Sequence, residues 1–213
     1  MLTFPKSAAF GRRFPKQKFY EHLEVDPQVK RLLVEQVKLI IWAYKLSPQT
    51  VNLSPGQAVG EIQVFQLALT GPELDERVTQ LMDRQIPYHL LFLLERPDGL
   101  QRLRIGYKEA SQSGHNAFQL RQSYQTGWAR PEDLSLDLTA LDMDGLYESI
   151  VRQIAGDAIT APEAETLKEA VEQTQEKEKR LRQIEALRAK MKKEKSLAKQ
   201  MEIRREIMRL EDI

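Results

Sequence analysis

Residues 61–69 constrain the fold more than any other stretch, because their apolar side chains occur in both alternating sets of an extended strand. The two sets are Ile62, Val64 and Ala68 on one side and Phe65, Leu67 and Leu69 on the other. A strand that is apolar on both faces typically lies inside a sheet and is covered on both sides. We therefore predict a single sheet with helices packed against it.

A long apolar helix is predicted before this strand. Asp26 is a good N-cap acceptor, and Pro27 suits the first helical position. The apolar side chains that follow are spaced three and four residues apart, which is typical of a helix face: Val29, Leu33, Val37, Ile40, Ile41 and Tyr44, widened by Trp42. The pair Ser47-Pro48 ends the helix, because a residue before proline avoids helical backbone angles. Trp42 and Tyr44 are accordingly expected in the core.

The chain then alternates between short helices and strands. Thr70 and Glu73 have capping-box spacing and predict a short helix that stops at Ile86-Pro87. Strands are predicted at residues 88–94, 102–107 and 118–124, with a last short strand at 134–138. A helix that ends at Gly156 completes the domain. This order predicts an α+β (mixed α/β) fold, a single sheet of about four to five strands with covering helices.

The C-terminal residues 163–213 contain no glycine and no proline. Thr160 and Glu163 form a second capping-box pair before them. A continuous helix over this stretch would be roughly 75 Å long. Its apolar seam, available to a partner helix, comprises Leu181, Ile184, Leu187, Met191, Met201 and Met208. Two arrangements are open: a long C-terminal helix that pairs with a partner chain as a coiled coil, or a helical hairpin bent near residues 192–196.

These patterns divide the chain into four parts. A basic and aromatic N-terminal segment covers residues 1–25, and the α+β domain covers residues 26–156. Residues 157–162 form a linker, and residues 163–213 form the charged helix. The boundaries fall where the composition changes.

Basic residues gather at both ends of the chain, although the net charge is only +1. Residues 1–18 carry five basic and no acidic residues, residues 19–162 carry 13 and 19, and residues 179–199 carry nine and two. We predict contact with nucleic acid or an acidic partner at these ends. The residues concerned are Arg12, Arg13, Lys16, Lys18, Arg180, Arg182, Arg188, Lys190, Lys192, Lys193, Lys195 and Lys199. The alternatives are an N-terminal segment whose rings pack on the domain and a solvated helix face.

The sequence offers few candidates for catalysis. It contains no cysteine, which excludes disulfides, thiolate catalysis and cysteine-bound metals, and it carries none of the familiar nucleotide-binding, hydrolase or metalloprotease motifs. The three histidines are far apart in sequence, so neither a metal site nor a cofactor is expected. Glu61, Lys108 and Glu109 are the candidates for a metal-dependent nuclease, which needs about two carboxylates near one ion. Their spacing does not force them together.

No segment has the roughly eighteen apolar residues of a membrane span, and the N-terminus lacks the hydrophobic core of a signal peptide. A cytoplasmic protein without membrane contact is therefore expected.

Several short strings together resemble a known family. They are residues 41–50 (Ile-Trp-Ala-Tyr-Lys-Leu-Ser-Pro-Gln-Thr), residues 61–65, Ile86-Pro87, Tyr107-Lys108 and residues 146–148. The chain is similar here to a bacterial and archaeal domain-of-unknown-function family, number four-three-nine-one, over residues 15–155. The resemblance implies no activity and no catalytic residues. It implies a setting beside helicase and DNA-methyltransferase genes in restriction or phage-defence islands.

Three functions are therefore considered. The first is a non-catalytic accessory or adaptor protein that contacts a protein partner, a helicase or methyltransferase-type complex or a second copy of itself, with nucleic acid as a further ligand. The second is a metal-dependent nuclease or other nucleic-acid enzyme. The third is a structural subunit without nucleic-acid contact.

Overall fold

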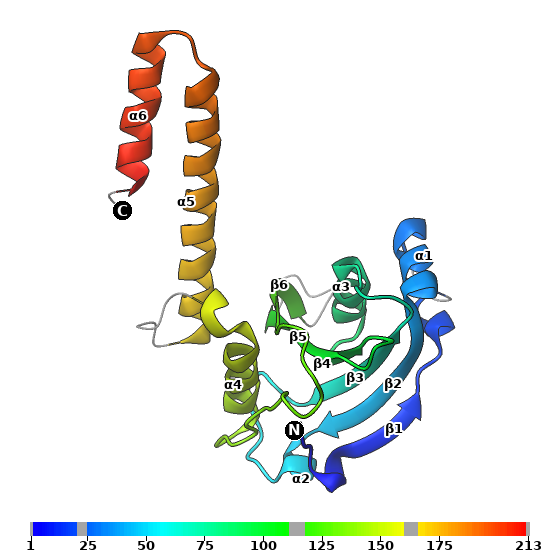
Figure 1. Cartoon of the computed structure of the whole chain (residues 1–213). Helices are drawn as coiled ribbons and strands as arrows, with labels where there is room; N and C mark the ends of the chain where they lie inside the picture. Colours follow the sequence, from blue (N-terminus) through cyan, green and yellow to red (C-terminus); the bar gives the residue numbers. More distant parts are fainter. Residues whose placement is uncertain (1, 21–24, 111–117, 160–165, 212–213) are drawn as a thin grey trace. The chain divides into compact units, whose positions relative to one another are not determined.

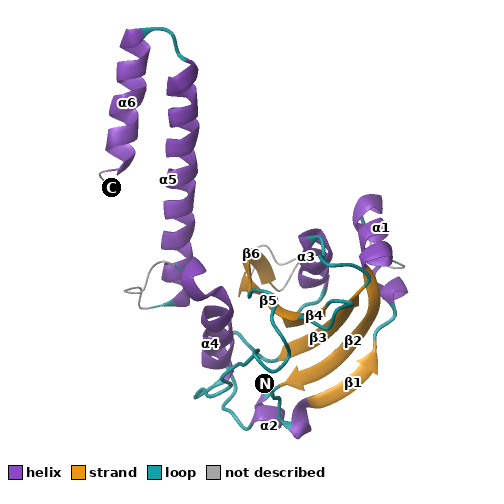
Figure 2. Ribbon diagram, in the orientation of Figure 1, coloured by secondary structure: helices purple, strands orange, loops and turns teal. Residues whose placement is uncertain are grey.

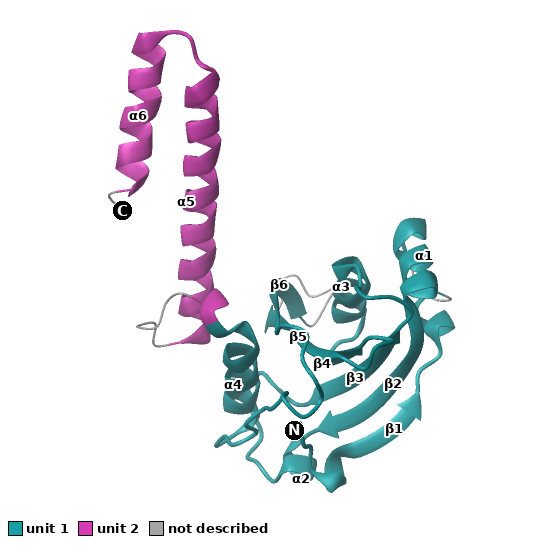
Figure 3. Cartoon of the chain, in the orientation of Figure 1, with its two compact units in different colours: residues 1–156 teal, residues 157–213 magenta. Residues whose placement is uncertain are grey.

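The computed structural model describes residues 2–20, 25–110, 118–159 and 166–211 of the 213-residue chain. The chain divides into two compact units, Met1–Gly156 and Asp157–Ile213 (Figure 3). In the described part of the chain, no helix is long and apolar enough to cross a membrane.

Unit 1 is built on one six-stranded sheet whose strands lie in sequence order (Figure 1). They are β1 (Ala9–Arg13), β2 (Val37–Leu46), β3 (Ile62–Leu69), β4 (His89–Glu95), β5 (Gln101–Ala110) and β6 (Phe118–Gln125). Neighbouring strands are antiparallel except β3 and β4, which are parallel. The predicted α+β fold with a single sheet is confirmed, but the sheet has more strands than the predicted four to five, because β1 and β2 were not expected as strands.

The helices of unit 1 are mostly short (Figure 2). They are α1 (Pro27–Gln36), α2 (Pro48–Val51), α3 (Glu76–Gln85) and α4 (Met143–Ala155), with 3₁₀ turns at Lys6–Ala8 and Lys16–Phe19. A further 3₁₀ turn, Gly156–Ala158, spans the boundary between the two units. Gly156 ends α4 with a positive φ of 49°, as predicted, and its N–H bonds to the carbonyl oxygen of Arg152. Helix α3 forms the crossover between the parallel strands β3 and β4.

The predicted helix from Asp26 to Ser47 is wrong in its second half. The N-cap prediction is confirmed, since the Asp26 carboxylate accepts from the backbone N–H of Gln28, but α1 ends at Gln36. Strand β2 follows directly and pairs with β3. Its pairing register shifts twice, and its buried residues therefore recur every three positions, as on a helix: Val37, Ile40, Ala43 and Leu46. The β-branched and aromatic residues of this stretch favour a strand.

Three smaller predictions about elements also differ from the structure. The helix expected to open at Thr70 begins at Glu76, with Asp75 as its N-cap, and the Thr70 hydroxyl donates instead to the carbonyl oxygen of Glu35. Residues 134–138 form no strand. The predicted cap at Thr160 and Glu163 lies outside the described residues, and the capping box of the next helix is formed by Thr166 and Glu169.

Helices cover both faces of the sheet. On one face, Leu33 of α1 and Met82 of α3 pack with Phe65 and Phe92 in a buried apolar cluster. On the other face, the Tyr147 ring of α4 contacts the His89 ring. The His89 side chain points away from the apolar cluster of the first face, because successive side chains of a strand point to opposite faces of the sheet. The internal strand β3 is buried along both faces, as predicted.

Unit 2 is a helical hairpin of α5 (Leu167–Lys193) and α6 (Leu197–Glu211). At the turn, the Glu194 carboxylate accepts from the backbone N–H groups of Lys195 and Ser196, both at 2.9 Å. These bonds lower the pKa of Glu194. Of the two arrangements left open by the sequence, the structure shows the hairpin, bent where the second predicted it.

Candidate functional site

The three nuclease candidates have separate surroundings. Glu61 lies just before β3, and its carboxylate is 2.6 Å from the Lys45 ammonium. Lys108 and Glu109 lie on β5, which β4 separates from β3. The Glu109 carboxylate accepts from Arg121 at 2.8 Å. Each candidate carboxylate is therefore held by a cation of the chain.

Among the residues that the structure describes, no group of three or more histidine, aspartate and glutamate side chains is placed to hold a metal ion. His89 lies on β4. His22 and His115 lie outside the described residues.

Lys108 belongs to a buried ion pair that no sequence motif indicates. Its ammonium lies 3.1 Å from the Asp83 carboxylate of α3 and donates to the carbonyl oxygen of Tyr88 at 2.7 Å, and both side chains of the pair are at most 1% exposed. Burial raises the pKa of Asp83 to about 6, although Lys108 attracts its charge, and burial lowers the pKa of Lys108. Gly106 leaves room for the pair, since a Cβ there would lie 2.8 Å from the Asp83 carboxylate. The pair joins α3 to β5 and is closed to any substrate.

A second buried group lies on the opposite face of the same strands. The His89 ring is 4.2 Å from the Tyr147 ring and 4.5 Å from the Phe118 ring, measured between centroids. The Tyr147 hydroxyl donates to the carbonyl oxygen of Gly106 at 2.7 Å and accepts from the backbone N–H of Lys108 at 2.8 Å. Burial, with a smaller effect of the Lys108 charge, lowers the pKa of His89 to about 4. His89 is therefore a neutral packing residue at neutral pH.

A carboxylate of α4 fixes the loop before β3. Asp144 accepts from the backbone N–H groups of Gln57, Ala58 and Val59, the shortest at 2.7 Å. A Cβ at Gly56 would lie 2.3 Å from the Asp144 carboxylate. Hydrogen bonds from three backbone N–H groups to one carboxylate are sufficient to fix the conformation of this loop without a ligand.

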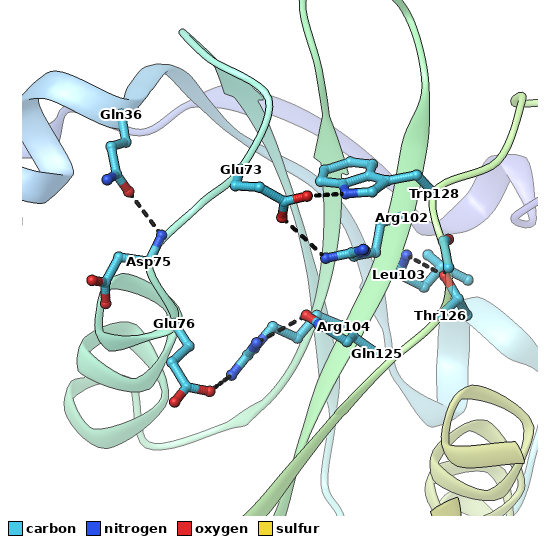
Figure 4. Close-up of polar contacts among 11 residues, drawn as sticks. Gln36, Glu73, Asp75, Glu76, Arg102, Leu103, Arg104, Gln125, Thr126 and Trp128 are labelled. Atoms are coloured by element: carbon cyan, nitrogen blue, oxygen red, sulfur yellow. Dashed lines mark hydrogen bonds and ion pairs between the residues drawn. The ribbon is translucent and has the colours of Figure 1, made fainter. Parts of the chain in front are cut away.

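Arginines on β5 hold the neighbouring loops by charged contacts (Figure 4). The Arg102 guanidinium lies over the Trp128 ring, 4.3 Å from its centroid, and 3.4 Å from Glu73. The Trp128 indole N–H donates to the same Glu73 carboxylate at 2.9 Å. Arg104, which is largely buried, donates to Glu76 at the start of α3. The alternation of arginines on this strand was visible in the sequence, but their partners were not.

The N-terminal cations expected to bind nucleic acid or an acidic partner have different roles. Arg12 and Arg13 are exposed on the edge strand β1. Lys18 is exposed, with its ammonium 5.8 Å from the centroid of the Phe14 ring. Lys16 instead donates to two backbone carbonyl oxygens at the end of α1, at 2.7 and 3.2 Å. Three of the four therefore present charge to solvent.

The hairpin carries an apolar groove between its two helices. Its volume is about 490 Å³, and it is lined by Arg188, Met191, Leu197, Gln200, Met201, Arg204, Ile207, Met208 and Glu211. Leu197 is 72% exposed, Met201 52% and Met208 54%. Arg188 and Glu211 join the two helices at its rim, 2.6 Å apart. This groove is an apolar surface that the hairpin leaves uncovered.

The structure divides the seam predicted from the sequence. Ile184, Leu187 and Met191 belong to the core between α5 and α6, together with Ile203, Ile207 and Leu210. Leu181, Met201 and Met208 lie outside that core and are more than half exposed.

The basic run of the hairpin is largely exposed, and Arg188 and Arg204 are the cations that line the groove. Arg182 pairs with Glu178 at 3.3 Å, and Arg188 pairs with Glu211. Arg180 is partly buried. The exposed lysines of the run are Lys190, Lys192, Lys193, Lys195 and Lys199.

Comparison with known proteins gives a family but no activity. A family model described as a domain of unknown function, DUF4391, matches residues 2–213, so the chain belongs to this family. No curated protein and no solved structure matches the chain.

Proposed function

We propose that this member of the family is a non-catalytic accessory or adaptor protein whose hairpin binds an acidic amphipathic helix of a protein partner. The observation that carries the proposal is the uncovered apolar groove between α5 and α6. The basic ends of the chain add contact with nucleic acid.

The groove has the features of an incomplete helical bundle. Three buried isoleucines form the centre of the hairpin core, with three partly buried neighbours. Two helices with so small a core gain little from packing, and a third helix would bury the exposed stripe of α6. Methionine suits such a site because its flexible side chain adapts to different partners. An added helix would contact Met201 and Met208 with its apolar face.

The charge of the hairpin favours an acidic partner over a second copy of the chain. Residues 179–199 carry nine basic and two acidic residues. Two hairpins packed groove to groove would bring these like charges together, which costs free energy. A helix with glutamate or aspartate along its flanks would instead pair with Arg204 and compete with Glu211 for Arg188.

The proposed setting is bacterial DNA restriction or phage defence, in a complex of the helicase or methyltransferase type. It is supported by the family resemblance, which implies a setting beside such genes, and by the basic ends, which suit work near DNA.

A designed peptide tests the proposal on the full-length protein. The probe is a soluble helix with leucine at heptad positions a and d and glutamate on its flanks, and binding is measured by calorimetry. Binding is expected for this peptide and not for a scrambled peptide of the same composition. Met201→Glu should weaken it at least about tenfold, because the new charge would lie in the apolar groove.

Ala198→Glu is the matched control, since Ala198 is exposed on α6 and does not line the groove. It should leave binding within about twofold, a difference well below 1 kcal/mol. Equal binding of the scrambled peptide would contradict the proposal. So would a stable dimer in light scattering that Met201→Glu dissociates, because a second copy would then occupy the groove.

A further inference from the structure

We propose that the β1–β2 edge of unit 1 binds single-stranded nucleic acid, with the Phe10 and Trp42 rings as a stacking platform and Arg12 and Arg13 as phosphate ligands. This inference deepens the nucleic-acid contact included in the proposed function. It does not depend on the hairpin groove.

Side chains of three strands form a continuous stack on one face of the sheet. The Phe10 and Trp42 rings are 4.2 Å apart, and the Trp42 and Phe65 rings are 5.8 Å apart and stacked. The Arg12 guanidinium covers the Phe10 ring at 4.7 Å from its centroid. Phe65 is buried, whereas Phe10 and Trp42 are partly exposed and Arg12 is exposed. The stack therefore has a rigid inner end and an outer end that a ligand can reach.

The charge around this stack is entirely positive along its two strands. No acidic residue occurs in residues 1–18 or 37–46, which contain β1 and β2. Arg13, which follows Arg12 on β1, and Lys38 on β2 are exposed. On these strands, a phosphate backbone would meet several cations and no like charge.

The backbone of β1 keeps the platform at the edge of the sheet. Gly11 has a φ of 62°, and the pairing register of β1 with β2 shifts between Ala9 and Arg12. Such a bulge re-aims the side chains that flank it, here Phe10 and Arg12. Because β1 is an edge strand of the sheet, no strand of the described chain pairs with its outer side.

Rings combined with cations favour a single strand over a duplex. The bases of a single strand are free to stack on aromatic side chains, whereas a duplex keeps its bases stacked internally and offers mainly phosphates to this surface. When a base arrives, Arg12 moves from the Phe10 ring to a phosphate. A base then takes the place of the guanidinium, and stacking of a base on an aromatic ring is stronger than an exposed cation–π contact.

Fluorescence anisotropy with the full-length protein tests the inference. The probes are short labelled oligodeoxythymidylate, oligouridylate and a duplex of mixed sequence, each at several salt concentrations. Binding of at least one single strand, more tightly than the duplex, is expected. Phe10→Ala should weaken it by roughly tenfold or more, and Phe10→Tyr should restore most of it, because tyrosine also stacks. Arg12→Gln with Arg13→Gln should reduce the slope of log K against log salt by about 1.4.

Two further measurements separate stacking on the platform from binding by the hairpin lysines. In a Trp128→Phe background, Trp42 is the remaining tryptophan, and its emission should be quenched on binding. Lys190→Gln with Lys192→Gln and Lys193→Gln should leave the effect of Phe10→Ala unchanged. No single-strand binding at low salt, a duplex bound as tightly, or equal binding by Phe10→Ala would overturn the inference. Each of these results leaves the helix-peptide test of the hairpin unaffected.

Discussion

Removal of one member of the Asp83–Lys108 pair should destabilise the protein far more than removal of both. Lys108→Met leaves the Asp83 carboxylate in a site where it is 1% exposed. Breaking a buried pair in this way costs about 3–5 kcal/mol of unfolding free energy, because the remaining charge has lost both water and its partner. Asp83→Leu should cost a similar amount, since among the described residues the Lys108 ammonium then keeps only the carbonyl oxygen of Tyr88 as an acceptor.

The double variant Asp83→Leu with Lys108→Met should be within about 2 kcal/mol of the parent, because apolar groups of similar volume replace both charges. The two single changes are therefore strongly non-additive, and the coupling energy is several kcal/mol. Urea unfolding followed by circular dichroism measures all four proteins. The variants expose similar surface on unfolding, so their midpoints can be compared at a common slope.

The pH dependence has a definite sign. Burial raises the pKa of Asp83 from 3.8 to about 6, so the folded protein holds this proton more tightly than the unfolded chain does. The contribution of protonated Asp83 to the free energy of unfolding is fully present below about pH 4 and is lost as the pH rises through about 6. Without Lys108 the folded pKa lies higher still, so the cost of Lys108→Met should be smaller at pH 5 than at pH 8. A cost below about 1 kcal/mol, or a double variant as unstable as the sum of the single variants, would refute this reasoning.

Three further predictions concern unit 1. Gly106→Ala should lower the unfolding free energy by about 2 kcal/mol or more in urea titrations, because its Cβ would crowd the Asp83 carboxylate; Gly127→Ala, where a Cβ meets no neighbour, is the control. Asp144→Asn should cost about 2–3 kcal/mol and speed amide exchange at the three N–H groups that it binds, and unchanged exchange would contradict this. Trp128→Ala should reduce the unfolding free energy by about 2–3 kcal/mol, against a smaller loss in Trp128→Phe, because both the ring under the guanidinium and the bond to the Glu73 carboxylate disappear.

The sequence predicted the internal strand well because its signal is local. Residues 61–69 have apolar side chains in both alternating sets, which indicates a strand covered on both faces, and β3 is buried on both faces in the structure. The cap at Asp26 and the helix end at Gly156 also depend on neighbours in the chain, whereas the bend of the C-terminal segment was only one of two arrangements left open. The cap and the helix end were predicted for the same reason.

The errors came from features that depend on distant partners. The bulges that give β2 a spacing of three exist only against β3, so the chain by itself could not distinguish that strand from a helix. The partner of Lys108 is Asp83 on α3, which no spacing rule connects to it. Likewise, the sequence does not show which seam residues of the C-terminal segment are buried, because that depends on how α6 folds back on α5.

Cross-linking of the native complex tests the central claim most directly. The full-length protein is purified from its own host after treatment with a lysine-reactive cross-linker, which Lys190, Lys192, Lys193 and Lys199 near the groove can engage. We predict links from these lysines to an acidic amphipathic helix of one partner protein, lost in Met201→Glu with Met208→Glu and kept in Ala198→Glu. The same partner and links in all three proteins would contradict the claim.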